Sequence, residues 1–186
     1  LGVSAAWLTG MCDFPGRKIL SWAFLLPMAM PAYIIAYTYT GILDFAGPVQ
    51  STLRATFGWG YGDYYFPQIR SIGGAICMLS LVLYPYVYML VRIAFLEQST
   101  AVLEASRNLG KKPWQTLFSV ALPMSRPAIV AGVSLALMET LADYGTVAYF
   151  GVSAFTTGIF RTWYGLGELT TAAQLCAFLL LFVFAL

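Results

Sequence analysis

Two acidic residues stand inside an otherwise apolar run of this sequence, and their positions suit chemistry on a charged group. Glu139 and Asp143 are four residues apart in the run 127–150, so one continuous helix would carry both on the same face. Carboxylates inside a membrane are costly and are functional candidates by default. With the neighbouring Tyr144 they offer oxygen donors that suit a hard cation in transit. A structural interpretation stays open beside this one, in which the carboxylates bond to neighbouring helices or to backbone.

The same acidic pair could act as general acid and base in an intramembrane enzyme. The rest of the sequence does not support that chemistry, because it has no His and no nucleophile arrangement. Gly110 and Lys111 form a Gly-Lys pair, but the glycine five residues upstream and the Ser or Thr of a phosphate-binding loop are missing. The cysteines are odd in number and far apart, which favours neither a disulfide framework nor a zinc site: Cys12, Cys77 and Cys176.

The composition is that of a membrane protein. Of the 186 residues, 60% are hydrophobic and 10% are charged, with a mean hydropathy of +0.76, whereas soluble domains have about 25% charged residues. The net charge of +2 comes from ten basic and eight acidic residues that are scattered along the chain. This distribution argues against a nucleic-acid-binding surface.

Four long apolar runs predict the elements that position the acidic residues. A bilayer core about 30 Å thick needs roughly 20 helical residues. The predicted spans are 19–43, 72–96, 127–150 and a truncated span at 172–186. We therefore predict an all-α fold, a polytopic bundle of transmembrane helices. Because the sequence starts without Met and ends inside an apolar run, we expect residues 1–186 to be a fragment of one transmembrane domain.

The basic residues predict the orientation of these spans. Seven of the ten fall before the first span or around the connection 97–126, and three fall in the other connections. Since Lys and Arg are retained on the cytoplasmic side, the connection 97–126 is predicted to be cytoplasmic. The connection 44–71 and the segment 145–168 are then on the outer side.

The cytoplasmic connection is itself patterned. Ser99 or Thr100 can cap a helix start, and Gly110 followed by Pro113 is a typical helix stop. The segment between them predicts a short amphipathic helix. From this pattern alone, two roles stay open: the helix offers a surface to another protein, or it rests in the lipid headgroup layer.

This connection resembles the EAA loop of binding-protein-dependent ABC importer permeases. That pattern reads E-A-A, three residues, G, nine residues, then I-x-L-P, and the sequence matches its spacing with Ser in place of the third-position Ala and Val120 in place of Ile. The resemblance implies a MetI-like permease core whose coupling helix docks on a cytoplasmic ATPase. It implies coupling roles for Glu104, Ala105, Ser106, Gly110, Leu122 and Pro123. ATP and Mg would be used by that partner, and this chain would bind no cofactor.

Other stretches resemble the N-terminal half of iron(III) transport permeases, among them 26–39, 83–99 and 138–168. This resemblance implies ferric iron as cargo in a bacterial inner membrane, with thiamine, molybdate or a polyamine as alternatives. It further implies three partners: a dimeric ABC ATPase, a periplasmic or extracellular solute-binding protein, and a second permease half. Arg161 and Glu168 would lie at the outer gate or docking surface, or would simply be solvated charges. We expect a transporter and not an enzyme.

Overall fold

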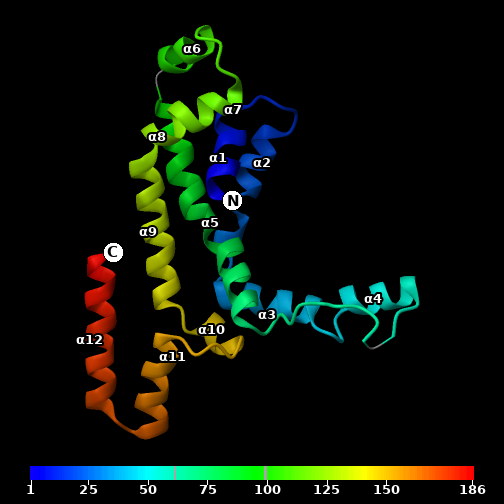
Figure 1. Ribbon diagram of the computed structural model, residues 1–186. Coiled ribbons are helices and arrows are strands. Elements are labelled where there is room, and N and C mark those ends of the chain that lie inside the picture. Colours follow the sequence, from blue (N-terminus) through cyan, green and yellow to red (C-terminus); the bar gives the residue numbers. More distant parts are fainter. Residues whose placement is uncertain (61, 99) are drawn as a thin grey trace. The chain divides into compact units, whose positions relative to one another are not determined.

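The computed structural model describes residues 1–60, 62–98 and 100–186 (Figure 1). It is 76% helical, and no strand occurs in these ranges, which confirms the predicted all-α fold. The chain divides into two compact units, Leu1–Ala29 with Leu83–Leu137 and Met30–Val82 with Met138–Leu186. Helices α5 (Ile72–Glu97) and α9 (Arg126–Ala142) contribute residues to both units.

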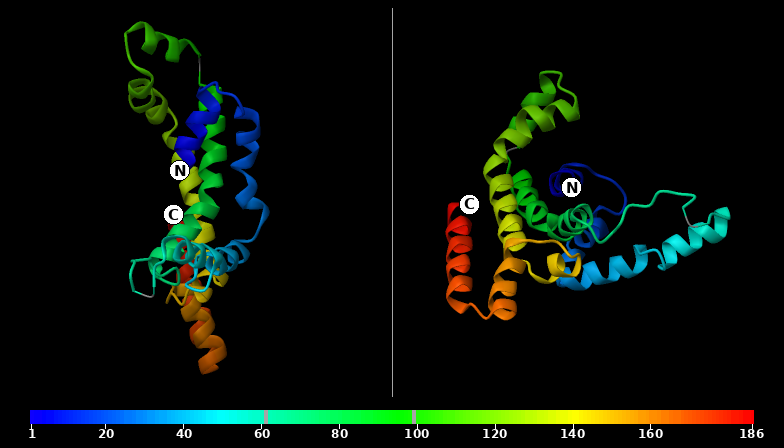
Figure 2. Two further views of the ribbon diagram at one scale, coloured as in Figure 1. Left: turned by 90° about the vertical axis from the view of Figure 1, so that its right-hand side faces the viewer. Right: turned by 60° about the horizontal axis from the view of Figure 1, so that its bottom comes forward.

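The first unit holds the N-terminal helices and the patterned connection. Its complete elements are α1 (Gly2–Met11), α2 (Arg17–Ala23), a 3₁₀ turn (Leu26–Ala29), α6 (Thr100–Asn108), α7 (Pro113–Thr116), a π-helix (Leu117–Ala121) and α8 (Leu122–Met124). Helix α1 lies side by side with the C-terminal part of α5 in both views (Figures 1 and 2). This part of α5 is therefore the central element of the unit.

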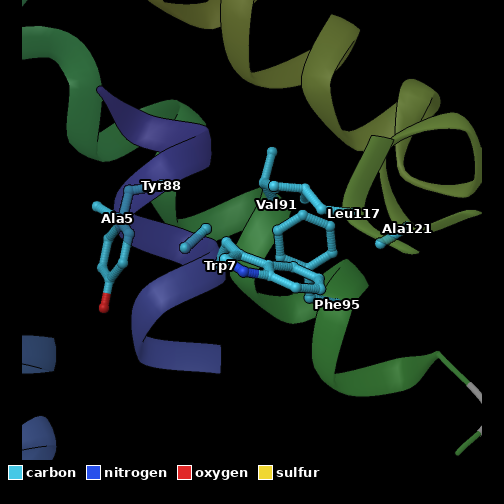
Figure 3. Packing of buried hydrophobic residues seen from close by; sticks show 8 residues of the cluster. Ala5, Trp7, Tyr88, Val91, Phe95, Leu117 and Ala121 are labelled. Atoms are coloured by element: carbon cyan, nitrogen blue, oxygen red, sulfur yellow. The ribbon is translucent and has the colours of Figure 1, made fainter. Parts of the chain in front are cut away.

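An aromatic pair forms the core of this unit (Figure 3). The Trp7 and Phe95 rings meet edge to face with centroids 5.6 Å apart, and Phe95 is fully buried. Leu117 and Ala121 of the π-helix close the cluster from the other side. In lipid such contacts stabilise by close packing rather than by removal of apolar surface from water. The core thereby connects α1 and α5 to the patterned connection.

Two polar links tie α1 to its neighbours, one of them part-buried at Arg17 and the other centred on the buried Tyr88. Arg17 donates to the carbonyls of Thr9 at 2.7 Å and Gly10 at 2.9 Å, which satisfies the C-terminal end of α1, and it pairs with Asp13. The Tyr88 hydroxyl lies 3.1 Å from Thr9 Oγ1 and donates to the Ser21 carbonyl at 3.1 Å. Polar groups within a membrane must be satisfied inside the protein, and these contacts do so.

The second unit holds α3 (Ala32–Leu43), α4 (Pro48–Phe57), α10 (Gly145–Tyr149), α11 (Phe155–Phe160), a π-helix (Arg161–Gly165) and α12 (Leu169–Ala185). Its core contains Ala36, Ala75, Met78 and Phe150. Helices α11 and α12 run antiparallel and side by side (Figures 1 and 2). Short helices joined by turns thus make up much of this unit.

The helices differ from the predicted spans in where they break. Among the described residues, α5 is the one helix long and apolar enough to cross a membrane, with a mean hydropathy of 1.9. Up to three spans result if Arg17–Ala29 with Ala32–Phe57, and Pro113–Met124 with Arg126–Ala142, each cross as one. The run 19–43 is interrupted at Pro31, which is extended (ψ 140°). Proline lacks the N–H that would continue the helix.

Candidate functional site

Helix α6 presents its acidic residue outward. Glu104 and Ala105 are exposed, whereas Ser106 is 5% exposed. The Ser106 hydroxyl is hydrogen-bonded to the hydroxyl of Thr116 in α7, at 3.0 Å between buried atoms. The residue that departs from the E-A-A pattern is therefore the one that attaches α6 to the following helix, and the two residues that match it are available to another surface.

The end of α6 requires Gly110. The N–H of Leu109 donates to the Ala105 carbonyl at 3.0 Å, and the N–H of Lys111 donates to the Ser106 carbonyl at 3.2 Å. The first is an ordinary helical bond, and the second reaches back five residues as in a Schellman-type stop, which places the residue before Lys111 in the left-handed region. Gly110 accordingly has φ +78°, and a Cβ added there would have no heavy atom within 4 Å. The glycine serves the backbone turn and leaves an open surface.

The rest of the motif forms a bent, partly π-helical segment. The N–H of Leu122 donates to the Leu117 carbonyl, five residues back, and Leu122 packs against the core of the first unit. Pro123 has no backbone N–H. The π-helical turn before it therefore leaves one fewer backbone donor without an acceptor than it would with another residue at this position. The segment Pro113–Met124 meets Arg126–Ala142 at 72°. Leu122 and Pro123 therefore lie in α8, directly before the bend that joins it to α9.

One amide side chain joins the two ends of this connection. Gln98 Nε2 donates to the Ala121 carbonyl at 3.0 Å and to Ser125 Oγ at 2.9 Å. It links the residue after α5 to the π-helix and to the residue before α9. Ser125 is 1% exposed, so these bonds are shielded from competing water and hold the ends of three elements together.

The two carboxylates of the second unit occupy different local structures. Helix α9 ends at Ala142, so Asp143 lies beyond the helix that carries the exposed Glu139. The Asp143 carboxylate accepts from the backbone N–H of Val147 at 3.1 Å and of Thr146 at 3.4 Å. This arrangement caps α10, as the structural interpretation of this residue expects. A role of Glu139 and Asp143 in a translocation path stays a prediction.

Tyr144 lies at a pocket in the second unit. Its ring stacks on Phe160 with centroids 4.0 Å apart, and both residues line a pocket of about 520 Å³ together with Arg161. Arg161 is exposed at the start of a π-helix, and Glu168 is exposed at the N-terminus of α12, where a negative charge is favourable. Both charges are thus accessible, and their predicted role at the outer gate or in docking is a prediction still.

Among the described residues, no group of three His, Cys, Asp or Glu side chains is placed to hold a metal ion together. Cys12, Cys77 and Cys176 are free thiols.

Comparison with known proteins decides the family. The model of the family described as "Binding-protein-dependent transport system inner membrane component" matches residues 2–186. The chain belongs to this family. Its match extends over both units and includes the whole patterned connection.

This inner membrane component is similar to permeases that are named for different cargoes. It is 26% identical over 149 residues to the molybdenum transport system permease protein ModB of Escherichia coli, covering 80% of this chain and 62% of that protein. It is 26% identical over 180 residues to the Fe(3+)-transport system permease protein FbpB 2 of Haemophilus influenzae, covering 97% of this chain and 31% of that protein. It is 28% identical over 153 residues to the sulfate transport system permease protein CysT of E. coli, covering 80% and 50%. The chain thus spans less than two thirds of the length of these relatives.

The contacts of Gln98, Thr116 and Ser125 in this inner membrane component were not predicted from its sequence. These residues are 10 to 27 positions away from their partners and follow no helical period. One signal was present, because Ser106 replaces the small apolar residue of the motif, and a buried hydroxyl needs a partner.

We predict that the Ser106 to Thr116 bond can be measured by a double-mutant cycle. Ser106→Ala and Thr116→Val should each lower the thermal stability of the purified protein, because each leaves one buried hydroxyl without a partner. The double substitution should cost less than the sum of the single ones, with a coupling energy of about 1 kcal/mol. Additive effects would show that the two hydroxyls do not act together.

Proposed function

We propose that this chain is part of the translocation path of an ABC importer, as a multi-pass subunit of the bacterial inner membrane. A separate cytoplasmic ATPase dimer hydrolyses ATP with Mg and docks on α6. One observation carries the proposal: the matched motif residues Glu104 and Ala105 are exposed on a short helix whose opposite side is attached to the chain through Ser106. A helix built in this way offers a free face and a fixed face.

The contacts of the fixed face form the path along which docking on α6 would displace the rest of the first unit. A displacement of α6 reaches α7 through the Ser106 to Thr116 bond, and the π-helix that follows is buried at Leu117 and Ala121. Gln98 then connects the Ala121 carbonyl to the end of α5. Energetic coupling between sites is carried by packed side chains and hydrogen bonds of this kind. Closure of the ATPase dimer would thereby move α5 within the first unit.

A binding protein and a second permease half complete the proposed importer. The exposed charges of Arg161 and Glu168 are accessible to a docked binding protein. Rim charges of this kind steer association more than they add affinity. Substrate selection would then rest largely with the binding protein.

Ferric iron is our proposed cargo. It is supported by the relative named for Fe(3+) transport, which aligns with 97% of this chain, and by oxygen donors such as the exposed Glu139 carboxylate. An oxyanion is the second candidate. Relatives named for molybdenum and sulfate transport favour it, as does Arg161 beside Tyr144 in the 520 Å³ pocket, since guanidinium groups bind oxyanions.

The test uses the complete importer, with its ATPase and binding protein, in proteoliposomes. We expect ATP-dependent uptake of ferric iron, and we expect the uptake rate to stay the same when molybdate and sulfate are added in excess. Glu104→Arg should lower uptake about tenfold or more, because a reversed charge at a docking surface is strongly unfavourable. Glu97→Arg is the matched control, since Glu97 is also exposed and belongs to the same predicted cytoplasmic side.

The outcomes separate the two levels of the proposal. Uptake of molybdate or sulfate in place of iron would overturn the cargo and keep the importer. Equal uptake by the Glu104→Arg and wild-type importers would overturn the docking role of α6.

A further inference from the structure

A small pocket in the first unit lies between α2 and α5. It has a volume of about 220 Å³, and its lining includes Ser21 and Trp22 of α2 and Met89, Arg92 and Ile93 of α5. Arg92 is the charged residue among those that line it. The function proposed above does not use this pocket.

Arg92 lacks a partner for its charge in the part of the chain that the structure describes. Its Nε is buried without a hydrogen-bond acceptor, and the ion pair found there joins Arg17 to Asp13 instead. A buried donor without an acceptor is unfavourable, and because the Arg92 side chain is otherwise partly exposed, its guanidinium can reach a group that enters the pocket. A cation in this state beside a pocket favours binding of an anion from outside the chain.

The position of Arg92 along α5 favours a lipid phosphate as this anion. Arg92 follows the start of α5 at Ile72 by 20 residues, which is about 30 Å of helix and equals the thickness of the hydrocarbon core. With one end of α5 at one boundary of the core, Arg92 lies at the other, where lipid phosphates are found. Trp22 beside it is 76% exposed, and Trp is enriched at this boundary.

We propose that this pocket binds the phosphate group of an anionic phospholipid. Arg92 donates to the phosphate oxygens, as guanidinium groups do with phosphates generally. Met89 and Ile93, which are 42% and 47% exposed on the same helix, provide an apolar surface for the acyl chain. Lys18 is exposed one turn before Trp22 and adds a second positive charge on that face of α2. The apolar surface distinguishes a lipid from a free phosphate ion.

The test uses Trp22 as a reporter in the full-length protein. The purified protein is placed in bilayers of phosphatidylcholine that contain a small fraction of brominated phosphatidylglycerol or brominated phosphatidylcholine. Bromine quenches indole fluorescence at close range, and Trp22→Phe identifies the share of the signal that comes from Trp22. We expect phosphatidylglycerol to quench Trp22 several-fold more strongly than phosphatidylcholine at the same fraction.

Two substitutions that each remove one positive charge distinguish binding at this pocket from general electrostatic attraction to anionic lipid. Arg92→Gln should remove the preference for phosphatidylglycerol, while Arg126→Gln, an exposed arginine on the same predicted side and outside the pocket, should keep it. Arg92→Lys should keep part of the preference, which confirms that loss in the Gln variant reflects charge and not misfolding. Equal quenching by the two lipids, or equal loss in both Gln variants, would overturn the proposal. Release of the quenching by excess inorganic phosphate would assign the pocket to a free phosphate and overturn the lipid.

Discussion

Gly110→Val should reduce ATP-driven uptake by about tenfold or more in the complete importer. The backbone at Gly110 has φ +78°, and a left-handed conformation costs an L-residue roughly 1–2 kcal/mol, more when it is β-branched. The bond from the Lys111 N–H to the Ser106 carbonyl, which ends α6, depends on this conformation. Since a Cβ at Gly110 would contact nothing within 4 Å, the loss arises from the turn and from the surface that approaches it, and no internal clash contributes.

Gly110→Asn is the informative companion. Asparagine tolerates the left-handed region better than other residues with a side chain, so this variant should retain the end of α6 and most of the thermal stability. If the ATPase approaches the backbone at Gly110 closely, uptake should still fall in the Asn variant. Transport rates and ATPase activity of the same preparations give the measurement. Full uptake by the Val variant would show that neither the turn nor its open surface matters for coupling.

Gly132→Leu should prevent stable packing of α9 on α5. A Cβ at Gly132 would lie 2.8 Å from Val87 Cα and 3.3 Å from the Tyr86 carbonyl oxygen. These are backbone atoms, so a change of rotamer cannot relieve the contact, and overpacking of this kind costs about 1–3 kcal/mol or more. Close approach at small residues is the main way in which helices associate in lipid. We expect a strongly lowered melting temperature in detergent and little intact protein in the membrane.

Gly41→Leu is the matched control for this substitution. Gly41 is also a helical glycine, but it is exposed and has no heavy atom within 4 Å of a built Cβ. It should therefore retain near-wild-type stability and expression. Similar losses in both variants would attribute the effect to replacement of helical glycine itself rather than to the contact with Val87.

The membrane environment, the helical class and the match to the EAA pattern could all be predicted from the amino-acid sequence. Long apolar runs require helices that satisfy their own backbone in lipid, and the run 72–96 forms the continuous helix α5. Gly110 and Pro113 end and restart helices through their own backbone limits, so the stop after α6 follows from local residue types. The family match over residues 2–186 agrees with what the motif implies.

Tertiary structure decided which polar side chains meet. Ser106 with Thr116, Gln98 with Ser125, and Thr9 with Tyr88 are 10, 27 and 79 residues apart, and no local pattern encodes such pairs. The sequence predicts Asp143 as a charge inside a membrane span. Because α9 ends at Ala142, the Asp143 carboxylate instead accepts a backbone N–H of α10 and caps that helix. Packing also leaves the Nε of Arg92 buried beside a pocket, which no local pattern predicts. Backbone limits act within a few residues and can be inferred from residue types, whereas these contacts depend on the directions in which packed helices aim their side chains.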